Sequence, residues 1–158
     1  MPKIIDHELR RNELLGPSLA LFSKHGFAGI GMRRLATELG VSTGVLYHYF
    51  PNKSALFESM LSRLAQSDVG GVIEQIEPGM DRLARLHLVV EFIIANASSI
   101  REIIDVLIDY RRTVGPDGDV LVRRVLDVYR TSLSDYLVDG AEPSWIAWRE
   151  LTRRYLKM

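Results

Sequence analysis

The spacing of apolar residues constrains the fold of this chain more than any other feature. Apolar residues return every three or four positions along almost all of the 158 residues, and no stretch alternates with a period of two for long. The clearest example is Met32, Leu35, Ala36 and Leu39, which precede Gly40. That spacing puts the apolar side chains on one face of a helix. The sequence therefore predicts an all-α protein.

Capping and helix-breaking residues divide the front of the chain into four helices. Gly26 and Gly40 favour C-terminal caps, while Ser42 and Asn52 favour N-terminal caps. Gly16-Pro17, inside the first segment, predicts a kink or a later start, because proline lacks a backbone N–H. We expect helices over residues 6–25, 32–39, 43–49 and 53–66.

Two glycine-containing breaks then separate the chain into two lobes. Gly70-Gly71 and residues 77–79 are the clearest helix-breaking signals. We therefore predict a first domain over residues 1–67 and a second over residues 68–158. Helical patterns in the second domain cover about 81–96, 98–114, 118–138 and 143–157.

Charge and composition narrow the class of partner. The 20 Lys and Arg balance the 20 Asp and Glu over the whole chain, yet the first domain has eight basic against five acidic residues and the second has twelve against fifteen. A basic first domain fits an anionic partner.

The chain has no cysteine, which excludes disulfides and thiolate sites. No apolar run reads as a signal peptide or a membrane span, so we expect a cytoplasmic protein without membrane contact.

Residues 32–51 have the form of a helix-turn-helix, two short helices joined by a glycine turn. Ala36 is small where the two helices cross, and Gly40 supplies a left-handed turn residue. A helical projection of residues 43–49 separates an inner, buried arc from an outer, exposed face. The core of the motif is predicted to hold Leu35, Leu39, Val41, Leu46, Tyr49 and Phe50, and the outer face Gly44, Val45, Tyr47 and His48. An exposed face of this kind suits the major groove of DNA.

The side chains around that face have the chemistry of nucleic-acid contacts. Hydroxyl and ring groups can bond phosphate oxygens, and Val45 or the methyl group of Thr43 can meet a thymine methyl. Lys53, at the start of the next helix, can hold a phosphate together with free backbone N–H groups. The predicted DNA contacts are Arg33, Arg34, Ser42, Thr43, Gly44, Val45, Tyr47, His48 and Lys53. For His48 and the two arginines, ordinary solvated side chains are the open alternative.

These residues carry a family resemblance. The segment MRRLATELGVSTGVLYHYFPNKSALFESML, preceded by LALFSKHGFAGIG, resembles the N-terminal DNA-binding domain of tetracycline-repressor (TetR) type transcriptional regulators over about residues 10–62. The resemblance implies a three-helix DNA-binding domain joined through a fourth helix to a helical domain for ligand binding and dimerisation. It implies a repressor that binds a palindromic double-stranded DNA operator as a homodimer. A small hydrophobic inducer would release the operator.

Two positions depart from the pattern of that family. Gly31 stands where the family usually has a threonine that caps the second helix, and Thr43 stands where a basic residue is frequent. One contact and one positive charge are therefore missing from the motif. The alternative function is a helical protein-interaction module that keeps the shape of the motif but binds DNA weakly or without specificity.

The second domain holds the candidates for a ligand pocket and for a dimer interface. An apolar space between its helices would suit the inducer, although apolar residues of this kind are more often simply core. The predicted pocket residues are Leu86, His87, Val90, Ile104, Leu107, Tyr110, Val125 and Tyr129. Aromatic residues are enriched in interfaces, and a dimer interface is predicted at Tyr136, Trp145, Trp148, Thr152 and Tyr155; packing on the core of the same chain is the alternative.

An enzyme is the competing class, and the sequence offers it no support. The four histidines, His7, His25, His48 and His87, lack metal-ligand spacing. No nucleophile elbow, zinc-protease motif or phosphate-binding glycine loop is present. We therefore expect no catalytic residue, no metal and no cofactor.

Overall fold

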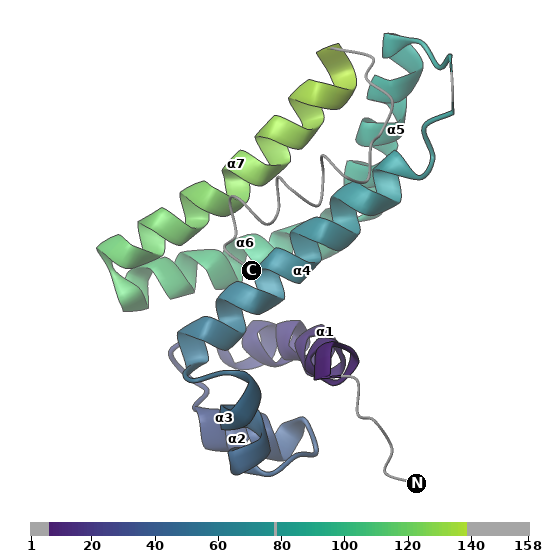
Figure 1. Cartoon of the computed structure of the whole chain (residues 1–158). Coiled ribbons are helices and arrows are strands. Elements are labelled where there is room, and N and C mark those ends of the chain that lie inside the picture. Colours follow the sequence, from purple (N-terminus) through teal and green to yellow (C-terminus); the bar gives the residue numbers. More distant parts are fainter. Residues whose placement is uncertain (1–6, 78, 139–158) are drawn as a thin grey trace, which may run out of the picture.

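Short-range capping contacts set the bounds of the first helices. The computed structural model describes residues 7–77 and 79–138, and every regular element in those ranges is a helix, which confirms the all-α prediction (Figure 1). Side-chain oxygens of Ser42 and Asn52 accept the backbone N–H groups of Val45 and Ala55 over 3.2 and 2.8 Å, so both predicted N-caps form. Gly26 and Gly40 have φ angles of 71° and 70°, as predicted for C-terminal turns. The helices are α1 (His7–His25), α2 (Met32–Glu38), α3 (Thr43–Tyr49), α4 (Lys53–Ile73), α5 (Arg82–Ala95), α6 (Ala97–Val114) and α7 (Pro116–Val138).

The predicted bounds of the first helix are confirmed, whereas the predicted end of the fourth helix is wrong. Helix α1 starts at His7 and continues through Gly16-Pro17, so no later start occurs. Helix α4 continues through Gly70-Gly71 to Ile73, seven residues past the predicted end. The side chains of Val72 and Ile73 are buried, and their burial offsets the low helix propensity of the two glycines.

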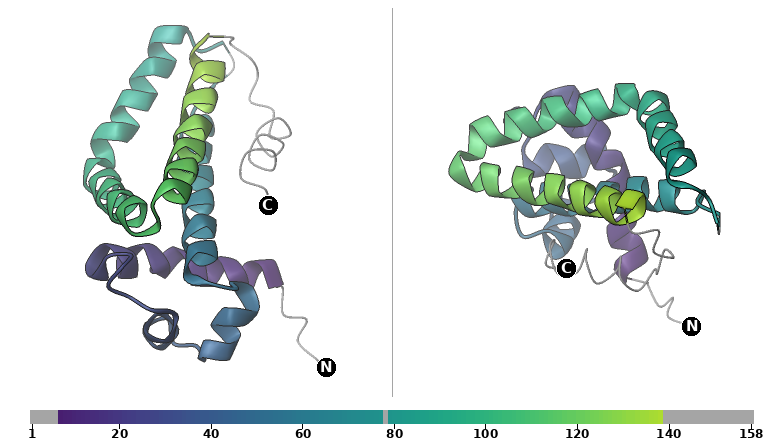
Figure 2. Two further views of the ribbon diagram at one scale, coloured as in Figure 1. Left: turned by 90° about the vertical axis from the view of Figure 1, so that its left-hand side faces the viewer. Right: turned by 90° about the horizontal axis from the view of Figure 1, so that it is seen from above.

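Helix α4 connects the two halves of the molecule. Its first turns pack against α1 beside the helix-turn-helix, and its later turns run alongside α7 (Figure 1). Seen from above, α5, α6 and α7 outline a triangle (Figure 2). The predicted boundary near residue 67 therefore falls within one continuous helix.

Helix α6 contacts α1, and its C-terminal residues also reach the α1–α2 loop and α4. The Tyr110 ring is buried and stacks on Phe57 of α4, with 4.5 Å between ring centroids, and meets the Phe27 ring edge-on at 4.7 Å. Its neighbour Asp109 accepts the backbone N–H of Ala28 over 3.1 Å. The loop between α1 and α2 is thus bonded directly to α6.

Two further features bear on the predictions for the second half. Among the helices described, none is long and apolar enough by itself to cross a membrane; α5 and α6, which are bent by 70° at Asn96, pass that test only as a pair. The last predicted helix, over residues 143–157, lies outside the described residues.

Candidate nucleic-acid interface and second-domain cavity

Helix α3 separates its side chains as the projection predicted. Leu46 and Phe50 are buried, and Tyr49 is partly buried, on the side that faces α1 and α2. On the opposite side Val45 and Tyr47 are 39% and 49% exposed, and Gly44 and His48 are exposed with them. Helix α3 therefore packs on the protein through a largely apolar inner face, and its outer face is accessible to a partner.

The turn before α3 is fixed by backbone hydrogen bonds. The N–H of Val41 donates to the carbonyl of Ala36 over 3.0 Å, and the N–H of Gly40 donates to that of Thr37 over 3.2 Å. Ser42 accepts from Val45 and keeps its own hydroxyl proton for an outside acceptor. Gly31 begins α2 without a side-chain cap, as its identity predicts.

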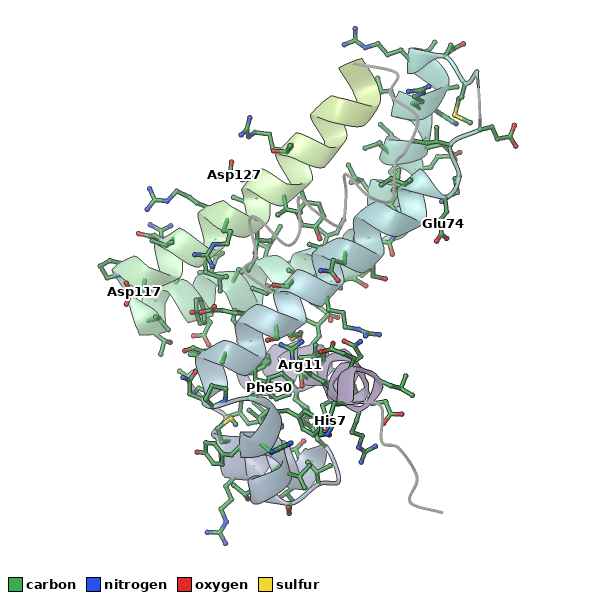
Figure 3. The ribbon with its side chains drawn as sticks, in the orientation of Figure 1. His7, Arg11, Phe50, Glu74, Asp117 and Asp127 are labelled. Carbon is green, nitrogen blue, oxygen red and sulfur yellow. The ribbon has the colours of Figure 1, made fainter. Side chains whose placement is uncertain are left out.

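Three aromatic rings meet at the end of α3. The His48 ring centroid lies 5.1 Å from that of Tyr49 and 5.7 Å from that of His7. His7 belongs to the first turn of α1, so α1 extends the exposed surface beside α3 (Figure 3). Sequence reasoning missed this neighbour, because residues about forty positions apart give no periodic signal.

Arg11 is a second residue that the sequence did not single out. Its guanidinium lies 5.2 Å from the centroid of the Phe50 ring and donates to the Ser59 hydroxyl over 2.6 Å (Figure 3). These contacts join α1, the end of α3 and α4. The orientation of α3 therefore depends on α1 and α4 as well as on α2.

The two arginines of α2 differ in their surroundings. Arg33 is exposed and has no polar side-chain partner among the described residues. Arg34 is exposed as well, but its Nε donates to Glu38 over 2.9 Å. Glu38 also lies 3.2 Å from His25, and the hydrogen bond from Arg34 is the main reason that its pKa is below the usual value. Arg33 is thus the arginine that is more available to a phosphate.

The ammonium group of Lys53 makes hydrogen bonds within the protein. Its ammonium donates to the backbone carbonyls of Phe27 and Ile30 over 2.6 and 2.9 Å, and burial lowers its pKa. Two of its three N–H donors are thereby used. Contact of Lys53 with a phosphate stays a prediction that rests on one remaining donor.

A cavity of about 250 Å³ lies in the second half of the molecule between α4, α5, α6 and α7. Four of the predicted pocket residues line it, namely Ile104, Leu107, Val125 and Tyr129. The other four do not. Its walls are formed by Leu61, Leu64, Asp68, Val72, Ile73, Ile76, Arg85, Val89, Phe92, Ile93, Ile100, Ile103, Ile104, Leu107, Val125, Leu126 and Tyr129.

The four predicted pocket residues that do not line the cavity lie in other parts of the structure. Leu86, His87 and Val90 are exposed on the other face of α5, where His87 pairs with Glu91 over 3.0 Å. Tyr110 is buried in the aromatic contact with α4 and the α1–α2 loop. Helix α5 turns Arg85, Val89, Phe92 and Ile93 toward the cavity. Asp68, Val72 and Ile73 of the α4 wall were missed because that helix was expected to end at residue 66.

The predicted dimer residues stay a prediction. Tyr136 lies within α7, and its side chain is outside the described part of the structure. Trp145, Trp148, Thr152 and Tyr155 lie outside the described residues altogether.

Comparison with known proteins gives a consistent result for the first half. Residues 14–60 match the family model described as "Bacterial regulatory proteins, tetR family". The HTH-type transcriptional regulator PksA of Bacillus subtilis is 33% identical over 105 residues, which are 65% of this chain and 50% of that protein. The HTH-type transcriptional repressor KstR of Rhodococcus jostii is 38% identical over 81 residues, 51% of this chain and 37% of that protein. The chain thus spans half or less of the length of these curated relatives.

Solved structures share the fold at low sequence identity. The fatty acid degradation regulator FadR of Bacillus halodurans superposes with a TM-score of 0.69 at 17% identity, covering 94% of this chain and 82% of that one. A putative TetR family regulator from Vibrio parahaemolyticus gives 0.58 at 18%, covering 94% and 97%. Identities this low support the fold alone.

Proposed function

We propose, from the match of residues 14–60 to the tetR family model, that the chain is a DNA-binding transcription regulator. It would repress its target by binding a palindromic operator as a homodimer. The observation that carries the proposal is the outer face of α3, with Val45 and Tyr47 exposed above buried Leu46 and Phe50. A helix of this kind enters the major groove in helix-turn-helix proteins. Such a regulator acts in the cytoplasm, where bacterial DNA lies.

The side chains of this surface divide by the part of DNA that they would contact. Tyr47, Ser42 and Arg33 would bond phosphate oxygens and fix the register of α3 on the duplex. Thr43 and Val45 would meet base edges, and Gly44 would allow close approach of the backbone. His48 and Arg34 would extend the phosphate contacts at either side.

Ligand control is the second part of the proposal. The cavity is lined in part by α4 and α6, and both of these helices also contact α1. A ligand that changes the spacing of α4 and α6 would move the α1–α2 loop through the Asp109 to Ala28 hydrogen bond and the Tyr110 packing. It would act as an inducer if it binds best to a conformation that DNA does not prefer.

A homodimer would match the two-fold symmetry of a palindromic operator. Two copies of α3 would enter major grooves about 34–36 Å apart, one helical turn of DNA. Sedimentation at micromolar concentration, with and without a duplex, tests this part. A chain that stays monomeric in both states would contradict it.

Selection of bound sequences from a random DNA pool tests the function itself. We expect enrichment of a palindrome, because a symmetric dimer places two equal helices on the duplex. Enrichment of a single half-site would support specific DNA recognition and contradict the proposed dimer. No enrichment would contradict the proposal and favour the protein-interaction alternative.

A further inference from the structure

A polar pair interrupts the largely apolar wall of the second-domain cavity. The hydroxyl of Tyr129, on α7, donates to a carboxylate oxygen of Asp68, on α4, over 2.8 Å. Both residues line the cavity, and the residues beside them there, Leu64, Val125 and Leu126, are aliphatic. Asp68 thus lies in a cavity whose other lining residues, apart from Tyr129 and Arg85, are apolar.

The charge of Asp68 has no cationic partner within the described residues. Its one described polar partner is the neutral Tyr129 hydroxyl. Partial burial raises the pKa of Asp68, and the hydrogen bond from Tyr129 opposes that rise. A partly buried carboxylate loses part of its hydration, which a cation or further donors can replace. A ligand cation would supply the missing partner.

Arg85 also lines the cavity, and its guanidinium is already engaged by the protein. Its Nε donates to the backbone carbonyl of Met80 over 3.0 Å, and it makes a further interaction with the protein. The guanidinium is therefore held against the loop before α5. Asp68 belongs to α4, near the middle of the cavity-lining part of that helix.

The size and rim of the cavity define the rest of the ligand. Its volume of about 250 Å³ is just below the range of roughly 300–1,000 Å³ usual for small-molecule sites, so it fits one slender molecule. Ile93, Ile104 and Leu126 line the cavity and are between 49% and 58% exposed. An alkyl chain that covers these three side chains would remove apolar surface from water.

We propose that the cavity binds a lipophilic primary amine, with the ammonium group paired to Asp68 and the alkyl chain between α4, α5, α6 and α7. The ammonium would donate to the carboxylate beside the Tyr129 hydroxyl, and the hydrocarbon walls would accept the chain. That such an amine acts as the inducer rests on the function proposed above. Its binding to the cavity does not.

Calorimetric titration of the full chain with three probes of equal chain length tests the pairing. Octylamine, octanol and octanoate differ in the charge of the head group at neutral pH. We expect octylamine to bind about tenfold or more tightly than octanol, as a hydrogen-bonded charge would give, and octanoate to bind most weakly. Asp68→Asn should reduce the affinity for octylamine to that for octanol. Octanol binding should be unchanged in that variant.

Each other outcome overturns the inference. Tightest binding of octanoate would assign the charge preference to Arg85, and equal affinities would remove any role for Asp68. The ranking in the unaltered protein decides this even where a variant folds poorly. Asp105→Asn, an exposed acid on α6 outside the cavity, is the matched control and should keep the ranking. The titration contains no DNA, so its outcome is independent of the DNA selection. Binding of octylamine without enrichment of an operator would support this inference and contradict the proposed function.

Discussion

The ammonium of Lys53 lies 2.6 Å from the backbone carbonyl oxygen of Phe27 and 4.3 Å from the centroid of the Phe27 ring. Phe27 belongs to the loop between α1 and α2, and its ring also contacts Phe57 and Tyr110. One lysine at the start of α4 thus joins the helix-turn-helix to the aromatic cluster shared with α6. Lys53 therefore has a structural role, whether or not it also contacts DNA.

Replacement of Lys53 by methionine should lower the free energy of unfolding by about 1–2 kcal/mol, because two charge-assisted hydrogen bonds are lost while the alkyl part is kept. Urea unfolding measures this, and Lys24→Met, at an exposed position of α1, is the control that should change little. If the remaining N–H also meets a phosphate, the slope of log affinity against log salt concentration will fall by about one. Equal stability of the Lys53 variant and the native chain would contradict the structural role.

Gly26→Ala should destabilise the protein more than Gly40→Ala. Both glycines have φ near 70°, where alanine costs about 1–2 kcal/mol. A Cβ at Gly26 would also lie 2.9 Å from Oδ2 of Asp109, whereas none of the neighbouring heavy atoms comes within 4 Å at Gly40. Displacement of Asp109 would break its bond to the Ala28 N–H, adding about 1 kcal/mol. Thermal unfolding of the two variants measures the difference, and equal losses would mean that the Asp109 contact contributes nothing.

Tyr47→Ala and Val45→Ala should alter DNA binding in different ways, although both residues lie on the exposed face of α3. Loss of the Tyr47 hydroxyl should weaken binding to every sequence by about fivefold, as expected for one phosphate hydrogen bond. Loss of Val45 should change the preference at one base pair of each half-site. Competition titrations with single-substitution duplexes separate the two. A uniform loss for Val45→Ala would show that this side chain does not contact base edges.

Asp68→Asn should stabilise the ligand-free protein at neutral pH and not in acid. Burial raises the pKa of Asp68, so the unfolded chain loses this proton first as pH rises, near its usual pKa of about 3.9. The folded state is then relatively destabilised, and the cost is complete above the folded pKa. Urea midpoints at about pH 7 and about pH 3 test this. A variant less stable than the native chain at neutral pH would contradict it, and Asp105→Asn should show no gain.

The helix-turn-helix was predictable from sequence because its determinants are local. Ser42 and Asn52 cap helices through bonds to backbone groups three positions away. The inner and outer faces of α3 follow from helical spacing alone. These features depend on neighbours within one or two turns, which the sequence displays directly.

The cavity was only half predictable, because it depends on contacts between distant residues. Asp68 and Tyr129 are 61 positions apart, and no period connects them. The glycines at 70 and 71 predicted a break in α4, whereas burial of Val72 and Ile73 against the second half extends the helix. Tyr110 looked like a pocket residue but packs on Phe57 of the first half. Tertiary packing decided each of these cases.

The affinity ratio between the selected palindrome and a shuffled duplex of equal length and composition tests the central claim most directly. Fluorescence anisotropy at physiological salt gives both affinities and the number of chains per duplex. We expect two chains per palindrome and a preference of about a thousandfold or more, as for specific regulators. Equal affinity for the two duplexes would contradict it.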